Sequence, residues 1–252
     1  MILFGRVHVI AGKYYFRGVF VKVIPVTGIS GSGKTTFIRS LIPLLARYGP
    51  IGTVKHTGHH SMELPTGKDT TVMFEAGARV VAGIDQGKTL ITLKGTSLMD
   101  ALELLAMQGI AIVIVEGYKG STLPQIIIGD LEAEECVLRD PAPEDVIPVL
   151  DRFPEYTSLG EVLRDLGEIC RRRRGEPCAT VTAIIPLTVG RKEATLELPL
   201  LVRSMEALPG VVGAKAAVRH GALFGGTNEL LVAVAAESGE EASSALLLAL
   251  AR

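Results

Sequence analysis

Cysteine is scarce in this chain, and the spacing of its three cysteines excludes two kinds of small domain. Cys136, Cys170 and Cys178 form no C-x-x-C pair. Zinc knuckles and disulfide-stapled secreted domains both depend on closely patterned cysteines. We therefore expect neither, and this cysteine usage fits a reducing cytoplasm.

Long apolar runs and an excess of one charge are also missing. The longest apolar stretches, 110–115 and 245–251 among them, fall well short of the roughly 20 residues that span a bilayer, so we expect no membrane helix. The first ten residues lack a small-residue cleavage site, which argues against a secretory signal. With 26 Lys+Arg against 27 Asp+Glu, nothing in the net charge favours a nucleic-acid partner.

The apolar pattern predicts an α/β protein with a second, smaller α+β domain. From residue 21, short apolar runs alternate with amphipathic stretches, which is typical of a mostly parallel sheet covered by helices. The run IAIVIV at 110–115 suits a central strand buried on both faces, or a buried helical segment. We expect a leader or hairpin at 1–20, a nucleotide-binding domain at 21–165, a basic linker at 166–177 and the small domain at 178–252.

The first helix of the nucleotide-binding domain carries conflicting signals at its end. Its apolar spacing predicts a helix to about Tyr48, with Gly49 as the cap. Pro43 removes a backbone donor inside this helix, so we expect a kink there or an early end.

A glycine-rich loop, residues 28–36, carries the strongest chemical signal. Its sequence GISGSGKTT matches G-x-x-x-x-G-K-[ST] and lies between a strand pattern and a helix pattern, which predicts a P-loop NTPase-type sheet. Such loops wrap phosphates with backbone N–H groups and the positive end of a helix. We expect phosphate contacts from Gly28, Ser30, Gly31, Ser32, Gly33, Lys34, Thr35 and Thr36. Lys34 should reach the β- and γ-phosphates, and the Thr35 hydroxyl should bind Mg²⁺.

A carboxylate is needed beside that metal, and the sequence offers two. Glu116 ends the apolar run IAIVIVEG, the position of a Walker B carboxylate, although it could simply mark a strand end facing water. Asp69, in GKDT, is the competing ligand.

The segment VKHTGHH at 54–60 lies on the same predicted edge of the sheet. His56, His59 and His60 could bind a metal or form an ordinary polar loop. Lys55 and Lys68 could contact phosphates or be solvated charges.

The sequence leaves open which reaction the site performs and which base it prefers, because the motifs that would decide them are absent. There is no N-K-x-D or T-K-x-D tetrapeptide to read guanine, and no evident water-positioning glutamine or arginine finger, so any hydrolysis should be slow. A small-molecule kinase or ATPase is weakened as an alternative, because Arg79 and Arg139 lie in no lid-like run. An adaptor with a vestigial nucleotide site is the other alternative.

Residues 21–140 carry six motifs in order: GISGSGKTT, KHTGHH, TGKDT, EAGA, IVIVEGYK and PQIIIG. Together they resemble the MobB family of molybdopterin-guanine dinucleotide biosynthesis adaptor proteins. The resemblance implies binding of GTP with Mg²⁺, weak GTP hydrolysis at most, and a homodimer. It implies partnership with the molybdenum cofactor guanylyltransferase, which attaches GMP to molybdopterin. Beyond the glycine-rich loop, it extends the site to Lys55, His56, Gly67, Lys68, Asp69 and Glu116.

The tail resembles a shortened, degenerate MoaE-type large subunit of molybdopterin synthase. The similarity lies in ATVTAIIPLTVGRKEATLELP, RHGAL and ELLVAVAAESGEEA. Ser238 and Gly239 stand where that family has a His-Arg pair, and no lysine follows Lys215. The resemblance therefore implies a binding or dimerisation module rather than a sulfur-transfer catalyst, with molybdopterin synthase or molybdopterin as a further partner.

Overall fold

The structure is a computed structural model that describes residues 7–10, 13–16, 20–58, 62–95, 97–119, 121–173, 178–187 and 197–250. His59, His60 and residues 174–177 of the expected linker lie outside this described part.

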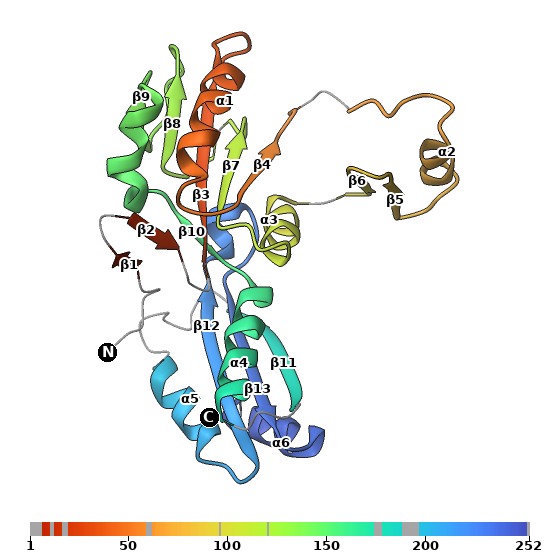
Figure 1. Cartoon of the computed structure of the whole chain (residues 1–252), viewed down its shortest axis with the longest axis vertical. Helices are drawn as coiled ribbons and strands as arrows, with labels where there is room; N and C mark the ends of the chain where they lie inside the picture. The colour runs from red at the N-terminus through yellow and green to blue at the C-terminus, as the bar shows by residue number, and fades with distance from the viewer. Residues whose placement is uncertain are drawn as a thin grey trace.

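A mostly parallel sheet forms the centre of the N-terminal part, which confirms the α/β prediction (Figure 1). Its strands lie in the order β4-β7-β3-β8-β9, all paired in parallel, and β10 pairs antiparallel with β3. Their bounds are β3 Phe20–Gly28, β4 Ile51–Lys55, β7 Ile112–Glu116, β8 Gln125–Ile128, β9 Cys136–Arg139 and β10 Glu155–Thr157. Strand β7 is the central strand expected from the run IAIVIV, and its residues 112–115 are buried.

Helices bury both faces of this sheet, which explains why its strands are continuously apolar. On one face, α1 (Lys34–Leu45) and the 3₁₀ helix η1 (Pro143–Arg152) pack on Ile112 and Ile114. On the other face, α3 (Leu98–Met107) packs on Val113 and Val115. The alternation of these four residues follows from the two-residue period of a strand.

Helix α1 ends at Leu45, with Ala46 as its C-cap. Pro43 lies in the last turn, so the early end expected from this proline is observed. The predicted cap at Gly49 is wrong, because the helix stops before reaching it.

Residues 62–95 form an arm that projects from the sheet (Figure 1). It contains α2 (Asp69–Glu75) and the antiparallel pair of β5 (Val80–Ile84) and β6 (Thr89–Leu93). Near the N-terminus, β1 (Val7–Ile10) and β2 (Lys13–Phe16) form a second antiparallel pair.

The C-terminal part is a three-stranded antiparallel sheet in the order β11-β13-β12. Its elements are β11 Ala179–Pro186, α5 Leu198–Glu206, β12 Val211–Arg219, the 3₁₀ helix η3 Gly221–Phe224, β13 Glu229–Ala236 and α6 Gly239–Leu250. Helices α5 and α6 bury one face. The other face is covered by α4 (Leu159–Arg173), a helix that begins within the expected first domain and continues into the expected linker.

A buried ion-pair network joins the two parts. The guanidinium of Arg219, on β12, donates to Glu103 of α3 at 2.7 Å and to Glu229 of β13 at 3.0 Å. It also donates to the Thr157 carbonyl at 2.8 Å. The Tyr156 hydroxyl donates to Glu103 at 3.0 Å, so one carboxylate connects helix, strand and sheet.

Candidate functional site

The glycine-rich loop adopts a backbone that side chains would obstruct. A Cβ at Gly28 would lie 2.2 Å from the carbonyl oxygen of Ile128, so only glycine fits between the two strands. Gly31 and Gly33 have φ values of 78° and 93°, in the left-handed region that favours glycine. Above these two glycines a Cβ would meet nothing within 4 Å, so the loop is open toward a ligand.

The N-terminus of α1 lies at this opening and carries no side-chain cap. Its N-cap is Gly33, and the first turn contains no acidic residue. Unpaired N–H groups and the positive end of the helix dipole therefore face the loop. Such an end can hold a phosphate.

Lys34 lies folded into the loop. Its ammonium group donates to the carbonyl of Ile29 at 2.5 Å and to the Ser32 hydroxyl at 3.4 Å. Partial burial lowers the pKa of Lys34, with Glu116 opposing this shift and the charges of Lys119 and Lys55 adding to it. An anion bound here would offset that crowding of positive charge.

Thr35, in the first turn of α1, meets Glu116, the last residue of β7. The Thr35 hydroxyl donates to the two carboxylate oxygens at 3.1 and 3.3 Å. Lys55 is paired with Glu116 in the parallel register of β4 and β7, and its ammonium lies 3.5 Å from the carboxylate. The sequence pattern predicted these three residues separately, and the fold brings them together.

The remaining predicted contacts divide between the loop and the arm. Ser30 and Thr36 are exposed on the loop and on α1, near the opening. Lys68 and Asp69 instead lie at the start of α2, which packs on β5 within the projecting arm (Figure 1). The structure therefore does not bring them to Thr35, and Gly67 precedes them in the same arm.

His56 follows β4 at the edge of the site. Its backbone N–H donates to the Glu116 carbonyl at 2.8 Å, and its ring contacts Tyr118 edge-on with centroids 5.0 Å apart. Within the described residues no group of three or more His, Cys, Asp or Glu side chains could hold a metal ion. Since His59 and His60 lie outside that part, the choice between a histidine metal site and an ordinary polar loop stays open.

Sequence reasoning missed the residues that support the loop from the β8 side. Asp140 accepts from the Gly129 N–H at 2.7 Å, and Arg139 donates to the carbonyls of Gly129 and Leu131 at 2.8 and 3.1 Å. A Cβ at Gly129 would lie 3.4 Å from the Ser32 Cβ, so this turn lies against the loop. Arg139, weighed above as a kinase arginine, is engaged in holding this turn.

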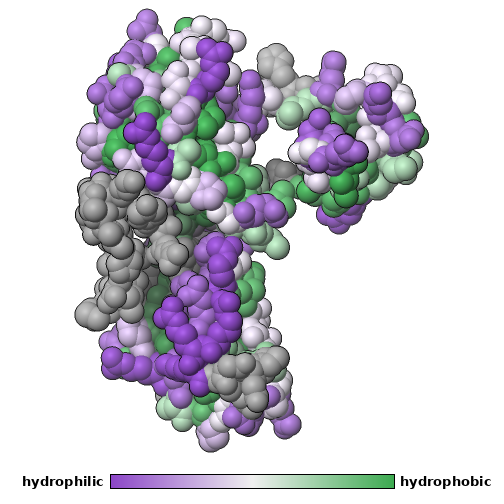
Figure 2. All heavy atoms as spheres, viewed as in Figure 1, coloured by the Kyte–Doolittle hydropathy of each residue, from purple (hydrophilic) through white to green (hydrophobic). Residues whose placement is uncertain are grey.

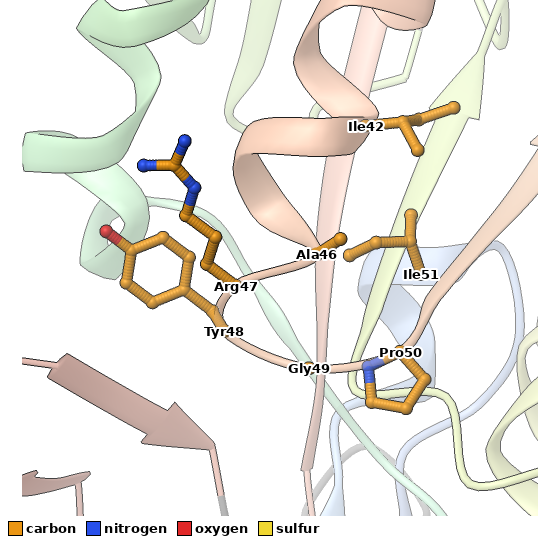
Figure 3. Close-up of a pocket in the computed structure, with 7 residues that line it drawn as sticks. All are labelled: Ile42, Ala46, Arg47, Tyr48, Gly49, Pro50 and Ile51. Atoms are coloured by element: carbon orange, nitrogen blue, oxygen red, sulfur yellow. The ribbon is translucent and has the colours of Figure 1, made fainter.

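A shallow pocket of about 440 Å³ lies at the other end of α1 (Figure 3). It is lined by Ile42, Ala46, Arg47, Tyr48, Gly49, Pro50 and Ile51. Because a 12-residue helix is about 18 Å long, this pocket is distinct from the opening at the glycine-rich loop.

Comparison with known proteins identifies the family. The family model for Molybdopterin guanine dinucleotide synthesis protein B, MobB, matches residues 23–150. The chain belongs to the MobB family. The matched segment contains the whole parallel sheet except the first residues of β3 and strand β10.

Individual relatives are similar to more than half of the chain. The molybdopterin-guanine dinucleotide biosynthesis adapter protein of Haemophilus influenzae is 32% identical over 167 residues, covering 62% of this chain and 88% of the relative. A Bacillus subtilis relative is 32% identical over 142 residues, covering 53% of this chain and 78% of its own. The crystal structure of Bacillus subtilis MobB covers 53% of this chain and 98% of that protein, at 23% identity and a TM-score of 0.42. In the described part of the chain, no helix is long and apolar enough to cross a bilayer.

Proposed function

We propose that this chain is a GTP-binding adapter that assists the attachment of GMP to molybdopterin. Membership of the MobB family assigns it a role in molybdenum cofactor biosynthesis. One observation carries the proposal for a nucleotide. An uncapped helix N-terminus, a lysine and a Thr35–Glu116 pair 3.1 Å apart converge on one glycine-rich loop.

The donor set at this loop fits Mg²⁺. A threonine hydroxyl and a carboxylate are the hard oxygen ligands that Mg²⁺ accepts, and the rest of its shell comes from water and phosphate. Thr35 and Glu116 would hold it, and the ion would neutralise charge on the terminal phosphates. Of the two carboxylates suggested by the sequence, we favour Glu116, because Asp69 lies in the arm.

Lys34 would leave the Ile29 carbonyl to pair with the β- and γ-phosphates, while Lys55 and His56 line the same edge. Without a group that orients the attacking water, this site would at most hydrolyse GTP slowly. Bound nucleotide would then act by changing what a partner enzyme recognises, not by being consumed in a fast reaction. We propose that this partner is the molybdenum cofactor guanylyltransferase.

The arm is the surface we propose for a homodimer. Figure 2 shows apolar surface gathered on the arm. The exposed large apolar side chains there are Met62, Val72, Met73, Val80, Ile84, Leu90, Ile91 and Leu93. Exposed apolar surface this concentrated marks interaction sites in soluble proteins.

We propose that the C-terminal part is a MoaE-like binding module for molybdopterin synthase or molybdopterin. The apolar face of α4 packs on Leu231 and Ala233 of this module. We therefore place the start of the module before Leu159, the first residue of α4. Full-length chain added to a synthase lacking its large subunit should restore no sulfur transfer. Restored activity would refute the reading of this module as non-catalytic.

The proposed function is tested by a Lys34→Ala variant in a guanylyltransferase assay that follows dinucleotide formation. We expect the variant to lose both triphosphate binding and stimulation of the enzyme. Arg39→Ala, which removes an exposed cation from the same helix, is the matched control and should retain both. Stimulation that survives loss of nucleotide binding would instead favour an adaptor with a vestigial site. Preference for ATP with a phosphorylated small-molecule product would favour a kinase.

A further inference from the structure

We propose that residues 116–118 form a joint through which nucleotide occupancy changes the conformation of residues 221–226 in the C-terminal part. The joint begins with the carboxylate of the nucleotide site and ends in contact with the turn after η3. The inference rests on the proposed function and extends it to regulation.

The first half of the joint is held tightly by the central sheet. The Gly117 N–H donates to the Val26 carbonyl at 3.0 Å, and a Cβ at this position would lie 2.6 Å from the His56 carbonyl oxygen. Gly117 and Tyr118 have φ values of 93° and 63°. Since tyrosine rarely adopts this left-handed conformation, the surrounding contacts must hold it there.

The second half of the joint contacts the C-terminal domain. A Cβ at Gly225 would lie 3.2 Å from the Tyr118 hydroxyl oxygen, so the tyrosine side chain reaches the turn after η3. From the same turn, Phe224 is buried in the core beneath β7, and Tyr118 packs against that core. The ring of Phe224 meets Tyr156 edge-on, with centroids 5.5 Å apart.

Occupancy of the nucleotide site would change what the start of the joint contacts. Glu116 now accepts from Thr35 and lies near Lys55. Bound Mg²⁺ would draw the Thr35 hydroxyl away from Glu116, and a bound polyphosphate would attract Lys55, so Glu116 exchanges partners. Gly117 and Tyr118 directly follow Glu116 in the chain. A change at Glu116 therefore shifts the Tyr118 ring, which lies between His56 and Gly225. A ligand shifts a distant segment only through such a difference in contacts.

The ion-pair network at Arg219 holds the rest of the contact between the N-terminal and C-terminal parts in place. The ion pair between Arg219 and Glu103, 2.7 Å long, joins β12 to α3. Arg219 is the last residue of β12 and comes shortly before η3 in the chain. Movement would therefore be confined to residues 221–226, whose amide hydrogen bonds are local and few. Among them are Gly226 N to Gly221 O at 2.9 Å and Leu223 N to His220 O at 3.2 Å.

Hydrogen–deuterium exchange of the full chain, with and without GTP and Mg²⁺, tests the joint. We expect exchange at residues 221–226 to change by roughly two-fold or more on binding, with residues 229–236 of β13 unchanged. This comparison needs no variant. GTP binding with unchanged exchange at 221–226 would overturn the inference and leave the proposed function standing. Failure of GTP to bind would overturn both.

Two variants locate the signal in Tyr118. Tyr118→Ala should bind GTP within roughly three-fold of the wild-type affinity but lose the exchange response at 221–226. Leu223→Ala, which trims an exposed side chain of the same turn, should keep the response. A full response in Tyr118→Ala, or its loss in Leu223→Ala, would show that the signal does not run through the tyrosine.

Discussion

Replacing Arg219 by methionine should destabilise the whole chain, because it leaves two carboxylates without their shared cation. The Arg219 side chain is 7% exposed, whereas Glu103 and Glu229 are 24% and 17% exposed. Removing one partner of a buried ion pair costs about 3–5 kcal/mol, and the partial exposure of both carboxylates favours the lower end. The guanidinium carbon of Arg219 also lies 5.1 Å from the centroid of the Tyr156 ring, so methionine removes this cation–π contact as well.

We therefore expect the Arg219→Met variant to lose about 3 kcal/mol of unfolding free energy. For a chain of this size that loss corresponds to about 6–12 °C in Tm. Urea unfolding followed by circular dichroism measures the first quantity, and calorimetry the second. A Glu103→Gln variant completes a double-mutant cycle, in which the two changes together should cost less than their sum.

The control for this prediction is Arg172→Met. Arg172 and Glu168 form an ion pair at 3.2 Å on the outer face of α4, but their side chains are 80% and 52% exposed. Solvent screens such a pair, so its loss should cost less than about 0.5 kcal/mol. Equal losses of unfolding free energy in Arg219→Met and Arg172→Met would refute the role given to the Arg219 network. So would strictly additive losses in Arg219→Met and Glu103→Gln.

Asp100, Tyr156 and Ile84 each allow a test by a single substitution. The backbone N–H and then the hydroxyl of Ser97 lower the pKa of Asp100, so its stabilisation is present above its unfolded pKa and lost as the pH falls below it. Asp100→Ala should therefore cost about 1 kcal/mol at pH 7 and less at about pH 3 in urea unfolding, whereas an equal cost would contradict the capping role. Burial raises the pKa of Tyr156, so its contribution is complete below its unfolded pKa and lost at higher pH. Between about pH 9 and 11, wild type should lose more stability than Tyr156→Phe, and parallel curves would argue against this. On the arm, Ile84 is 80% exposed, so Ile84→Asp should shift sedimentation toward monomer, whereas the control Leu247→Asp, at an exposed position of α6 outside the arm, should not; an unchanged dimer would exclude this surface.

Features that depend on local sequence were predictable. The run IAIVIV gave a central strand because both of its faces are apolar, and Pro43 marked the early end of α1 because proline cannot donate within a helix. The loop around Lys34 was predictable because its glycines, lysine and threonine are consecutive and lie between a strand and a helix. In each case the determining residues are neighbours in the chain.

Features that depend on long-range packing were not predictable in this way. Asp69 resembled a metal ligand in sequence, but the direction in which residues 62–95 leave the sheet decides whether it reaches the site. Helix α4 looked like the end of one domain because its basic end suggested a linker, yet its apolar stripe packs on the next sheet. The pairing of Glu103 with Arg219 spans 116 positions, and no local pattern marks either residue as a partner.

The proposed function depends on the glycine-rich loop binding a nucleoside triphosphate. Calorimetric titration of the full chain with GTP, ATP and GDP, each with and without Mg²⁺, tests this directly. We expect saturable binding of GTP that is tighter with Mg²⁺, weaker binding of ATP, and no binding by Lys34→Ala. Absence of heat from any triphosphate at millimolar concentration, in protein shown to be folded, would contradict nucleotide binding by this loop.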